Sequence, residues 1–242
     1  MIFAINRLYR ILFCRGGHGV HSPFVFDLIT NVIEEKRLYY CYERLNAVRL
    51  QLLQDNREIT FGNRKLTIRK MLNRNCFTER EHRFLFRLAN RFQPKTIYVA
   101  GSDFGLNPLY LTAYSKKSSC TVFEPELSVA DIAHEFINKY ALASIDICNR
   151  MADIPDHIDL IVWGNSFTGT SFSMQAFDRI LTNVNDESVM VFSGINASPE
   201  NRKTWDAICQ HSEVTVSLDL YNLGVVFFNP KLHRKTYKNI IF

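Results

Sequence analysis

Short apolar runs alternate along the second half of the chain with segments whose apolar residues recur at helical spacing. Such runs are typical of buried strands, and such spacing is typical of helices that cover a sheet. This alternation predicts a doubly wound α/β fold, with a mostly parallel sheet covered on both faces. We expect strands at five places, namely residues 96–100, 121–123, 144–148, 158–163 and 188–194.

Helices are expected between these strands, and several have recognisable start signals. Ser198 followed by Pro199 combines a capping serine with proline at the first helical position. Ser171 and Ser173 are alternative caps for a helix that runs through Leu181. Further helices are predicted over residues 106–114 and from a cap at Ser128 to about residue 142.

The end of the chain departs from this alternation. Two β-rich runs, 214–220 and 225–228, are separated by only a few residues. A connection this short cannot make a parallel crossover, so we expect an antiparallel hairpin. The expected fold is therefore a Rossmann-like sheet of seven strands that finishes with an antiparallel strand.

The first 95 residues are predicted to be mainly helical. The Ser22–Pro23 pair starts one helix, residues 42–53 form a second, and the capping box Thr78–Glu81 opens a third. The polar and basic residues 56–75 are expected to form a loop or a mobile lid. The predicted organisation is a helical extension or cap followed by an α/β domain, with bounds of 1–77 and 78–242.

The turn after the strand at 96–100 carries the strongest candidate chemistry. Gly101 and Gly105 bracket it, and about twenty residues later the next expected strand ends on Glu124. Glycines permit a sharp turn and the close approach of a ligand, and a strand-terminal carboxylate can accept from both hydroxyls of a ribose. The pattern predicts a nucleoside site. Asp103 has two open roles there, contact with a ligand's amino group or capping of the following helix.

The amino-acid composition indicates the size of the core and the cellular compartment that we expect for this protein. A chain of 242 residues that is 47% hydrophobic can bury a full core. Its six cysteines are scattered without a Cys-x-x-Cys pair, which indicates reduced thiols in a cytoplasmic protein and no structural metal. Arg7 and Arg10 interrupt the apolar start, so we expect neither a signal peptide nor a membrane span.

The net charge of +5 is unevenly distributed. Residues 1–95 hold 18 Lys and Arg against 8 Asp and Glu, whereas the remainder holds 11 against 16. The basic residues are interspersed with apolar ones and form no block, so a nucleic-acid partner is not expected. A small-molecule partner is favoured, and homo-oligomerisation is left open.

The segment Gly17-His18-Gly19-Val20-His21-Ser22-Pro23-Phe24 is distinctive. Together with the glycine turn and the closing hairpin, it resembles a group of bacterial class I S-adenosylmethionine-dependent methyltransferases, found notably in Bacteroidetes. In that group a helical extension with this motif precedes the methyltransferase domain, and the resemblance covers nearly the whole chain. It implies S-adenosylmethionine as the cofactor, bound by Gly101, Ser102, Asp103, Gly105, Glu124 and Asn165.

Acidic positions of the resembled proteins carry other residues here. Val99 stands where an acid supports the methionine end of the cofactor, and Trp163 stands where related O-methyltransferases have a metal-binding aspartate. Ser193 and Gly194 replace paired aspartates at the tip of the next strand. Because a divalent cation needs charged oxygen ligands to offset its dehydration, the resemblance implies a site without a metal.

Two functions remain in competition. The first is metal-independent methyl transfer to a small-molecule acceptor, with His18 and His21 as candidate acid–base groups facing the cleft beneath a layer of N-terminal helices. These histidines could instead orient the neighbouring helix start. The second is a catalytically silent protein of this fold, a pseudoenzyme for ligand sensing or partner binding, which Val99 and Trp163 favour. RNA methylation is disfavoured, because the chain has no Asn-Pro-Pro-Tyr-like or catalytic cysteine motif.

Overall fold

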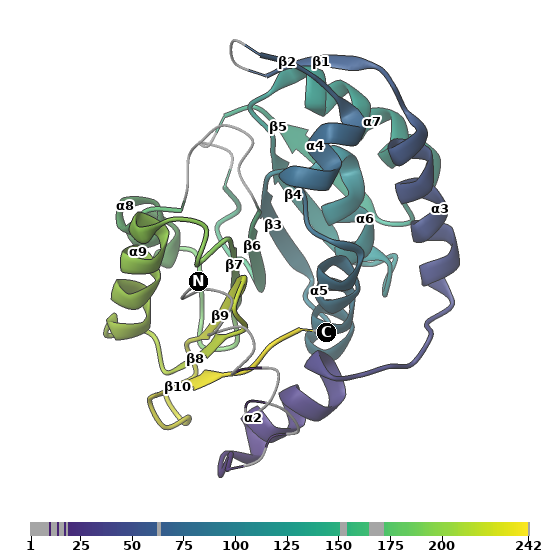
Figure 1. Ribbon diagram of the computed structural model, residues 1–242. Helices are drawn as coiled ribbons and strands as arrows, with labels where there is room; N and C mark the ends of the chain where they lie inside the picture. The colour runs from purple at the N-terminus through teal and green to yellow at the C-terminus, as the bar shows by residue number, and fades with distance from the viewer. Residues whose placement is uncertain are drawn as a thin grey trace.

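One central sheet of eight strands organises the computed structural model, which describes Arg10, Cys14, Gly17 and residues 19–61, 64–150, 154–164 and 172–241. The strand order is β10-β8-β9-β7-β6-β3-β4-β5 (Figure 1). Neighbouring strands are parallel except where β9 pairs with β7 and β8, so the expected doubly wound α/β fold with an antiparallel strand near its end is confirmed. The bounds are β3 Thr96–Ala100, β4 Ser119–Phe123, β5 Ser144–Cys148, β6 Leu160–Trp163, β7 Val189–Ser193, β8 Val216–Asp219, β9 Leu223–Phe227 and β10 Lys235–Lys238.

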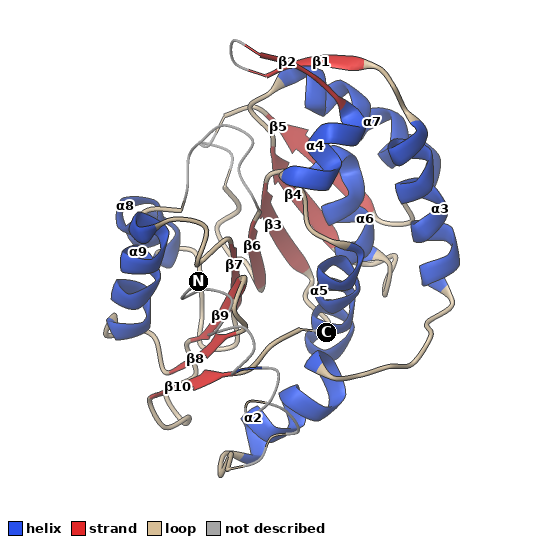
Figure 2. Cartoon of the chain, viewed as in Figure 1, coloured by secondary structure: helices blue, strands red, loops and turns tan. Residues whose placement is uncertain are grey.

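Helices cover both faces of this sheet (Figure 1, Figure 2). Leu85 and Leu88 pack with Val99 on the first face, while Trp205 packs with Tyr98 on the second. Val99 and Tyr98 are consecutive residues of β3, and successive strand residues point to opposite faces, so this strand supplies both cores. The first face carries α5 Glu79–Phe92, α6 Leu106–Thr112 and α7 Leu127–Tyr140, and the second carries α8 Met174–Leu181 and α9 Pro199–Gln210.

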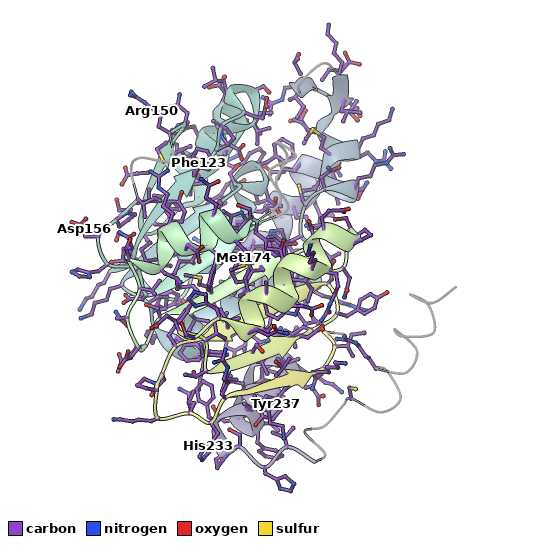
Figure 3. The ribbon with its side chains drawn as sticks, turned by 90° about the vertical axis from the view of Figure 1, so that its left-hand side faces the viewer. Phe123, Arg150, Asp156, Met174, His233 and Tyr237 are labelled. Atoms are coloured by element: carbon purple, nitrogen blue, oxygen red, sulfur yellow. The ribbon has the colours of Figure 1, made fainter. Side chains whose placement is uncertain are left out.

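The eighth strand, β10, was not predicted. It pairs in parallel with β8 at the edge of the sheet, with Lys235 opposite Val216. Figure 3 looks from the side of α8 and α9, with Met174 labelled at the start of α8 and Tyr237 on this outer strand. Three of its four residues are exposed and Tyr237 is half-buried, so the strand lacks the apolar run that marks a buried strand.

Several helix starts follow the predicted capping chemistry. The side chain of Ser22 accepts from the Val25 amide at the start of α2 Pro23–Leu28, which continues as the π-helical turn η1 Ile29–Ile33. Thr78 and Glu81 form the expected capping box. Ser173 and Ser198 cap α8 and α9. The expectation for Ser128 was wrong, because α7 begins earlier and this hydroxyl donates to the Thr60 carbonyl instead.

The prediction of a loop or lid over residues 56–75 was also wrong. This region forms a hairpin and a helix, which follow α3 Cys41–Gln54: β1 Glu58–Phe61, β2 Arg64–Thr67 and α4 Ile68–Arg74. Its apolar residues Ile59, Ile68, Met71 and Leu72 are buried. They join α3 to α6 and α7 in one cluster, so this part of the chain is packed in place.

The first N-terminal helix that the structure describes, α2, packs against the sheet through Phe24. The Phe24 ring packs on Phe92 and Phe227, with centroids 6.5 and 5.0 Å away. Phe227 pairs with Val189, the first residue of β7, so α2 covers the amino edge of the sheet. The N-terminal helices were expected to cover the carboxyl edge of the sheet, where the ligand site was predicted. The helix α2 does not lie there. No helix in the described part of the chain is long and apolar enough to cross a membrane.

Candidate functional site

The turn that follows β3 has an unusual backbone. Gly101 and Gly105 have φ angles of 93° and 92°, which only glycine adopts at little cost. Asp103 and Phe104, at 48° and 58°, are consecutive left-handed residues that are not glycine. A side chain at Gly105 would place its Cβ 3.2 Å from the Ala133 carbonyl of α7. The turn is therefore strained and held closely against α7.

Glu124 lies at the carboxyl end of β4 and reaches this turn. One carboxylate oxygen, Oε2, accepts from the Ser102 amide at 2.9 Å and from the Ser102 hydroxyl at 2.7 Å. The other, Oε1, accepts from the Glu126 amide at the long distance of 3.4 Å. Glu124 is only 1% exposed, and burial raises the pKa of its carboxyl, while the hydrogen bonds from Ser102 act in the opposite direction. The structure thus brings together Gly101, Ser102 and Glu124.

These groups lie at the point where the strand order reverses. β3 has β4 on one side and β6 on the other, and open α/β sheets bind ligands at the carboxyl ends of strands at such a switch point. After β6, the Gly164 amide donates to the Ala100 carbonyl at 2.8 Å. A Cβ on Gly164 would lie 2.9 Å from that carbonyl oxygen, so only glycine permits this approach of the two strands.

The tips of β6 and β7 carry no carboxylate in the described residues. Trp163 ends β6, is 5% exposed and stacks on Phe192 with ring centroids 6.5 Å apart. Ser193 ends β7 and is also buried. No group of three or more His, Cys, Asp or Glu residues with metal-binding geometry occurs in the part of the chain that the structure describes. Asn165, expected to contact the cofactor, lies outside the described residues.

Asp103 does not cap the helix after the turn. Its Oδ2 accepts from the Phe77 amide at 2.7 Å, and His82 Nε2 lies 3.6 Å from the same oxygen. Its Oδ1 has no hydrogen-bond partner in the described residues, although the side chain is fully buried. The thiol of Cys76, a weak donor, also interacts with this carboxylate. The capping alternative is thereby excluded.

A buried chain of polar groups behind the turn was not predicted. Arg49 of α3 approaches His82 Nδ1 at 3.4 Å, and His82 Nε2 lies 3.0 Å from Asn107 Oδ1. Arginine only donates, so His82 Nδ1 is the acceptor and Nε2 carries the proton. Asn107 then donates to the Gly101 carbonyl at 2.8 Å. The N-terminal helix α3 is thereby connected to the glycine turn through the side chains of His82 and Asn107.

The sequence contained one signal for this chain of contacts. His82 lies three and four residues before Leu85 and Phe86, on the apolar side of its helix, and all three are buried. A histidine on an apolar stripe must find polar partners when it is buried. Its partners could not be identified, because they lie 33 residues before it and 25 residues after it.

Of the two histidines predicted as candidate acid–base groups, the structure describes only His21. His21 is exposed and immediately precedes α2, the element that packs at the amino edge through Phe24. Glu124 lies at the opposite, carboxyl edge, so the structure does not bring His21 to the glycine turn. His18 lies outside the described residues.

Comparisons with known proteins identify the fold. A scan against protein-family models found no match, and neither did a search of curated proteins. The SAH-bound methyltransferase PaMTH1 of Podospora anserina matches with a TM-score of 0.56 and 12% identity, over 80% of this chain and 99% of that one. An O-methyltransferase from Bacillus cereus in complex with SAH matches with a TM-score of 0.55 and 14% identity, over 84% and 97%. Cofactor-bound Rv0187 from MTB gives 0.59 and 11%, over 86% and 97%.

At sequence identities this low, the similarity to these structures shows the fold alone. The chain has the Rossmann-like fold of class I methyltransferases, with a mainly parallel sheet and an antiparallel strand near its end. A fold alone does not define an activity, so function must be argued from the residues at the carboxyl edge.

Proposed function

We propose that this protein binds S-adenosylmethionine at the carboxyl ends of β3 and β4 and transfers its methyl group to a small-molecule acceptor. The observation that carries the proposal is the buried Glu124–Ser102 pair beside the strained glycine turn, at the switch point of the sheet. A carboxylate that is 1% exposed at a strand tip is costly unless donors approach it.

The donor set of S-adenosylmethionine fits the acceptors present. Its ribose hydroxyls match Glu124 Oε1, which has only one long hydrogen bond within the described residues. Its primary ammonium is a cation, and the carboxylates of Glu124 and Asp103 are both buried close to Ser102. Gly101, with a φ of 93°, lets the chain turn sharply at the end of β3, where the ligand would lie. When bound, the sulfonium would supply an electrophilic methyl group. Trp163 and Phe192, which are buried and stacked on each other, make the core beside the tip of β6 apolar.

Calorimetric titration with S-adenosylhomocysteine tests this proposal. We expect saturable binding by the native chain and at least about tenfold weaker binding by Glu124→Gln, because hydrogen bonds to a charged group contribute about 1.5–3 kcal/mol. Glu126→Gln is the matched control, since it removes a charge two residues away and keeps the backbone amide. Equal affinity of a folded Glu124→Gln variant and the native chain would refute the assignment of Glu124.

The environment of Trp163 favours a second candidate function. This large ring occupies the tip of β6 and packs into the core with Phe192, so it supplies no carboxylate to the site. A protein that binds the nucleoside for sensing or partner binding, without methyl transfer, is compatible with that arrangement. Conversion of S-adenosylmethionine to S-adenosylhomocysteine with a panel of hydroxylated and aminated aromatic compounds separates the two: turnover supports the enzyme, and tight binding without turnover supports the silent protein.

A further inference from the structure

A basic surface on the N-terminal part of the chain is not used by the proposed function. Residues 58–74, which include β1, β2 and α4, contain five Lys and Arg against the single acid Glu58. Four of these basic residues are exposed, namely Lys65, Arg69, Lys70 and Arg74. None of the four forms an ion pair with another described residue, whereas Arg57, just before β1, is paired with Asp55 and Glu135. The positive charge of this surface is therefore uncompensated.

The helix α4 presents this charge from a fixed position. Its apolar residues Ile68, Met71 and Leu72 are at most 1% exposed and pack in the core with α3, α6 and α7. The opposite half of the helix carries the basic side chains. Lys70 and Arg74 are four residues apart, a spacing at which like charges repel and destabilise a helix. An anion bound to this face would offset that repulsion.

A hollow of about 510 Å³ lies beside these cations, between α4 and the end of α3. It is lined by Leu53, Gln54, Asn56, Arg69 and Asn73. Three of these residues have amide side chains, which can donate and accept hydrogen bonds as the edges of nucleotide bases do. The volume lies in the range of about 300–1,000 Å³ that small-ligand pockets have. The hollow thus has the size and the polar groups to hold one nucleotide, next to cations that can bind phosphates.

This surface borders the carboxyl edge of the sheet. The Ser128 hydroxyl, near the start of α7, donates to the Thr60 carbonyl of β1 at 3.1 Å. Glu124, at the end of β4, precedes Ser128 by only four residues. Figure 1 shows β1, β2 and α4 together at the top of the molecule, beside α7. A partner bound to these elements would therefore lie close to the end of β4.

We propose that β1, β2 and α4 bind a single strand of nucleic acid, with phosphates on the exposed cations and one nucleotide in the hollow. The proposal does not depend on the proposed function. In the sequence, apolar residues separate the basic ones, and a nucleic-acid partner was not expected for that reason. Folding buries these apolar residues and leaves a basic face. The cations are spread over a strand and a helix, which suits successive phosphates of a chain better than one small anion.

The test is fluorescence anisotropy of a labelled single-stranded RNA of about 12 nucleotides, titrated with the full chain. We expect saturable binding at about 50 mM salt that weakens as salt is added. The slope of log affinity against log salt should be about −2 to −3, because four cations each release about 0.7 counterions from a single strand. Absence of saturable binding at low salt would overturn the proposal.

A triple variant removes the charges of α4: Arg69→Ala, Lys70→Ala and Arg74→Ala. Alanine favours the helix, and all three positions are exposed, so the fold should be kept. We expect the affinity for the RNA to fall at least about tenfold and the salt slope to lose about two. The affinity for S-adenosylhomocysteine should not change, which separates this proposal from the proposed function.

A control variant removes three exposed lysines elsewhere: Lys116→Ala, Lys117→Ala and Lys203→Ala. It loses the same net charge, so it reports the effect of overall charge alone. We expect its affinity and salt slope to stay within about twofold of the native values. If the control loses as much affinity as the α4 variant, the binding is not located on α4 and the proposal is overturned.

Asn73→Ala tests the hollow without changing the charge. We expect this variant to bind the RNA about three- to tenfold more weakly with the salt slope of the native chain, because a neutral hydrogen bond is lost. An unchanged affinity would overturn the placement of a nucleotide in the hollow. Tighter binding of a duplex of the same sequence than of the single strand would also overturn it, since the hollow accepts an unpaired base.

Discussion

At the scale of single residues, Glu124 combines two opposing demands. Burial disfavours its charged form, whereas the Ser102 amide and hydroxyl favour it. A ligand that donates ribose hydroxyls would favour the charged form further. The residue is therefore placed so that ligand binding and ionisation support each other.

The affinity for S-adenosylhomocysteine should consequently depend on pH. Because the pKa of Glu124 is raised above its ordinary value of 4.5, part of the free protein carries a neutral Glu124 at mildly acidic pH. In the free protein a raised carboxyl pKa adds stability at low pH, which is lost as the pH rises through that pKa. The affinity for the ligand has the opposite pH dependence and rises with pH, because the ribose hydroxyls donate to the ionised carboxylate.

Titrations between about pH 5 and pH 8 should therefore show affinity that rises with pH and then levels off. The same series with Glu124→Gln should lose this rise, because the amide does not titrate in that range. A rise of the same size in the variant would assign the pH dependence to another group.

At the scale of elements, a buried ion pair joins the last strands to the N-terminal segment. Arg10 donates to Asp219 Oδ1 at 2.6 Å and to the Asn239 carbonyl at 3.3 Å. Arg202 of α9 reaches the other carboxylate oxygen at 2.7 Å. Burial acts to raise the pKa of Asp219, but the hydrogen bonds and charges of the two arginines outweigh it and hold that pKa below the ordinary value. Residues far apart in the sequence are thus fixed at the ends of β8 and β10.

Asp219→Asn should destabilise the protein by about 3–5 kcal/mol, because it leaves buried Arg10 without its counter-charge. Urea unfolding measures the change, and Asp206→Asn, which breaks an exposed pair with Arg202, should cost at most about 1 kcal/mol. Since the pKa of Asp219 is depressed, its contribution should be present above the unfolded pKa of about 3.9 and be lost as the pH falls below it. A small effect of Asp219→Asn, equal to that of Asp206→Asn, would contradict this account.

The strand tips lead to a prediction about metals. Trp163 and Ser193 end β6 and β7, where a cation site would need charged oxygen ligands. We expect methyl transfer, measured as formation of S-adenosylhomocysteine, to be unchanged by a chelator and by added magnesium. Activity that is lost to the chelator and restored by magnesium would contradict the prediction.

Local signals in the sequence predicted most elements. Capping serines and the capping box mark the starts of helices. Each cap bonds a backbone amide only three residues further along the chain, so a short stretch of sequence is enough to predict it. The hairpin at 58–67 had a signal as well, since Gly62-Asn63 is a dipeptide typical of two-residue hairpin turns, and Ile59 and Phe61 alternate with polar residues before it. The polar and basic residues around it favour a loop instead. β10 has no such signal in its own sequence, because its residues are mostly exposed and polar. It is stabilised as a strand by its pairing with β8, which is distant in the chain.

At the scale of the whole molecule, the N-terminal elements are part of the same core. α3 and α4 bury Leu45, Leu52 and Met71 in one cluster with α6 and α7, and Arg49 reaches His82 behind the glycine turn. The proposed division into an extension over residues 1–77 and a domain over 78–242 therefore does not imply independent folding units.

Deletion of residues 1–75 should expose this apolar surface and leave an aggregation-prone fragment. The measurements are solubility, the cooperativity of thermal unfolding, and calorimetric affinity for S-adenosylhomocysteine. A soluble fragment 76–242 that melts cooperatively and binds with unaltered affinity would show that the extension is a separate module.

The candidate site was predictable only where it is local. Gly101, Ser102 and Glu124 follow from the strand–turn–helix–strand order, which places strand tips together. Asp103 was recognised, but its two roles could not be separated until the contact with Phe77 excluded capping. Asn107 and His82 escaped prediction because their relation depends on how α5 packs on α6, which no local pattern specifies.

The most direct test of the central claim is a crystal structure of the protein grown with saturating S-adenosylhomocysteine. The account predicts the adenosine across the carboxyl ends of β3 and β4, with both ribose hydroxyls within hydrogen-bond distance of Glu124. A ligand bound elsewhere, or a carboxyl edge that stays empty at saturation, would contradict it.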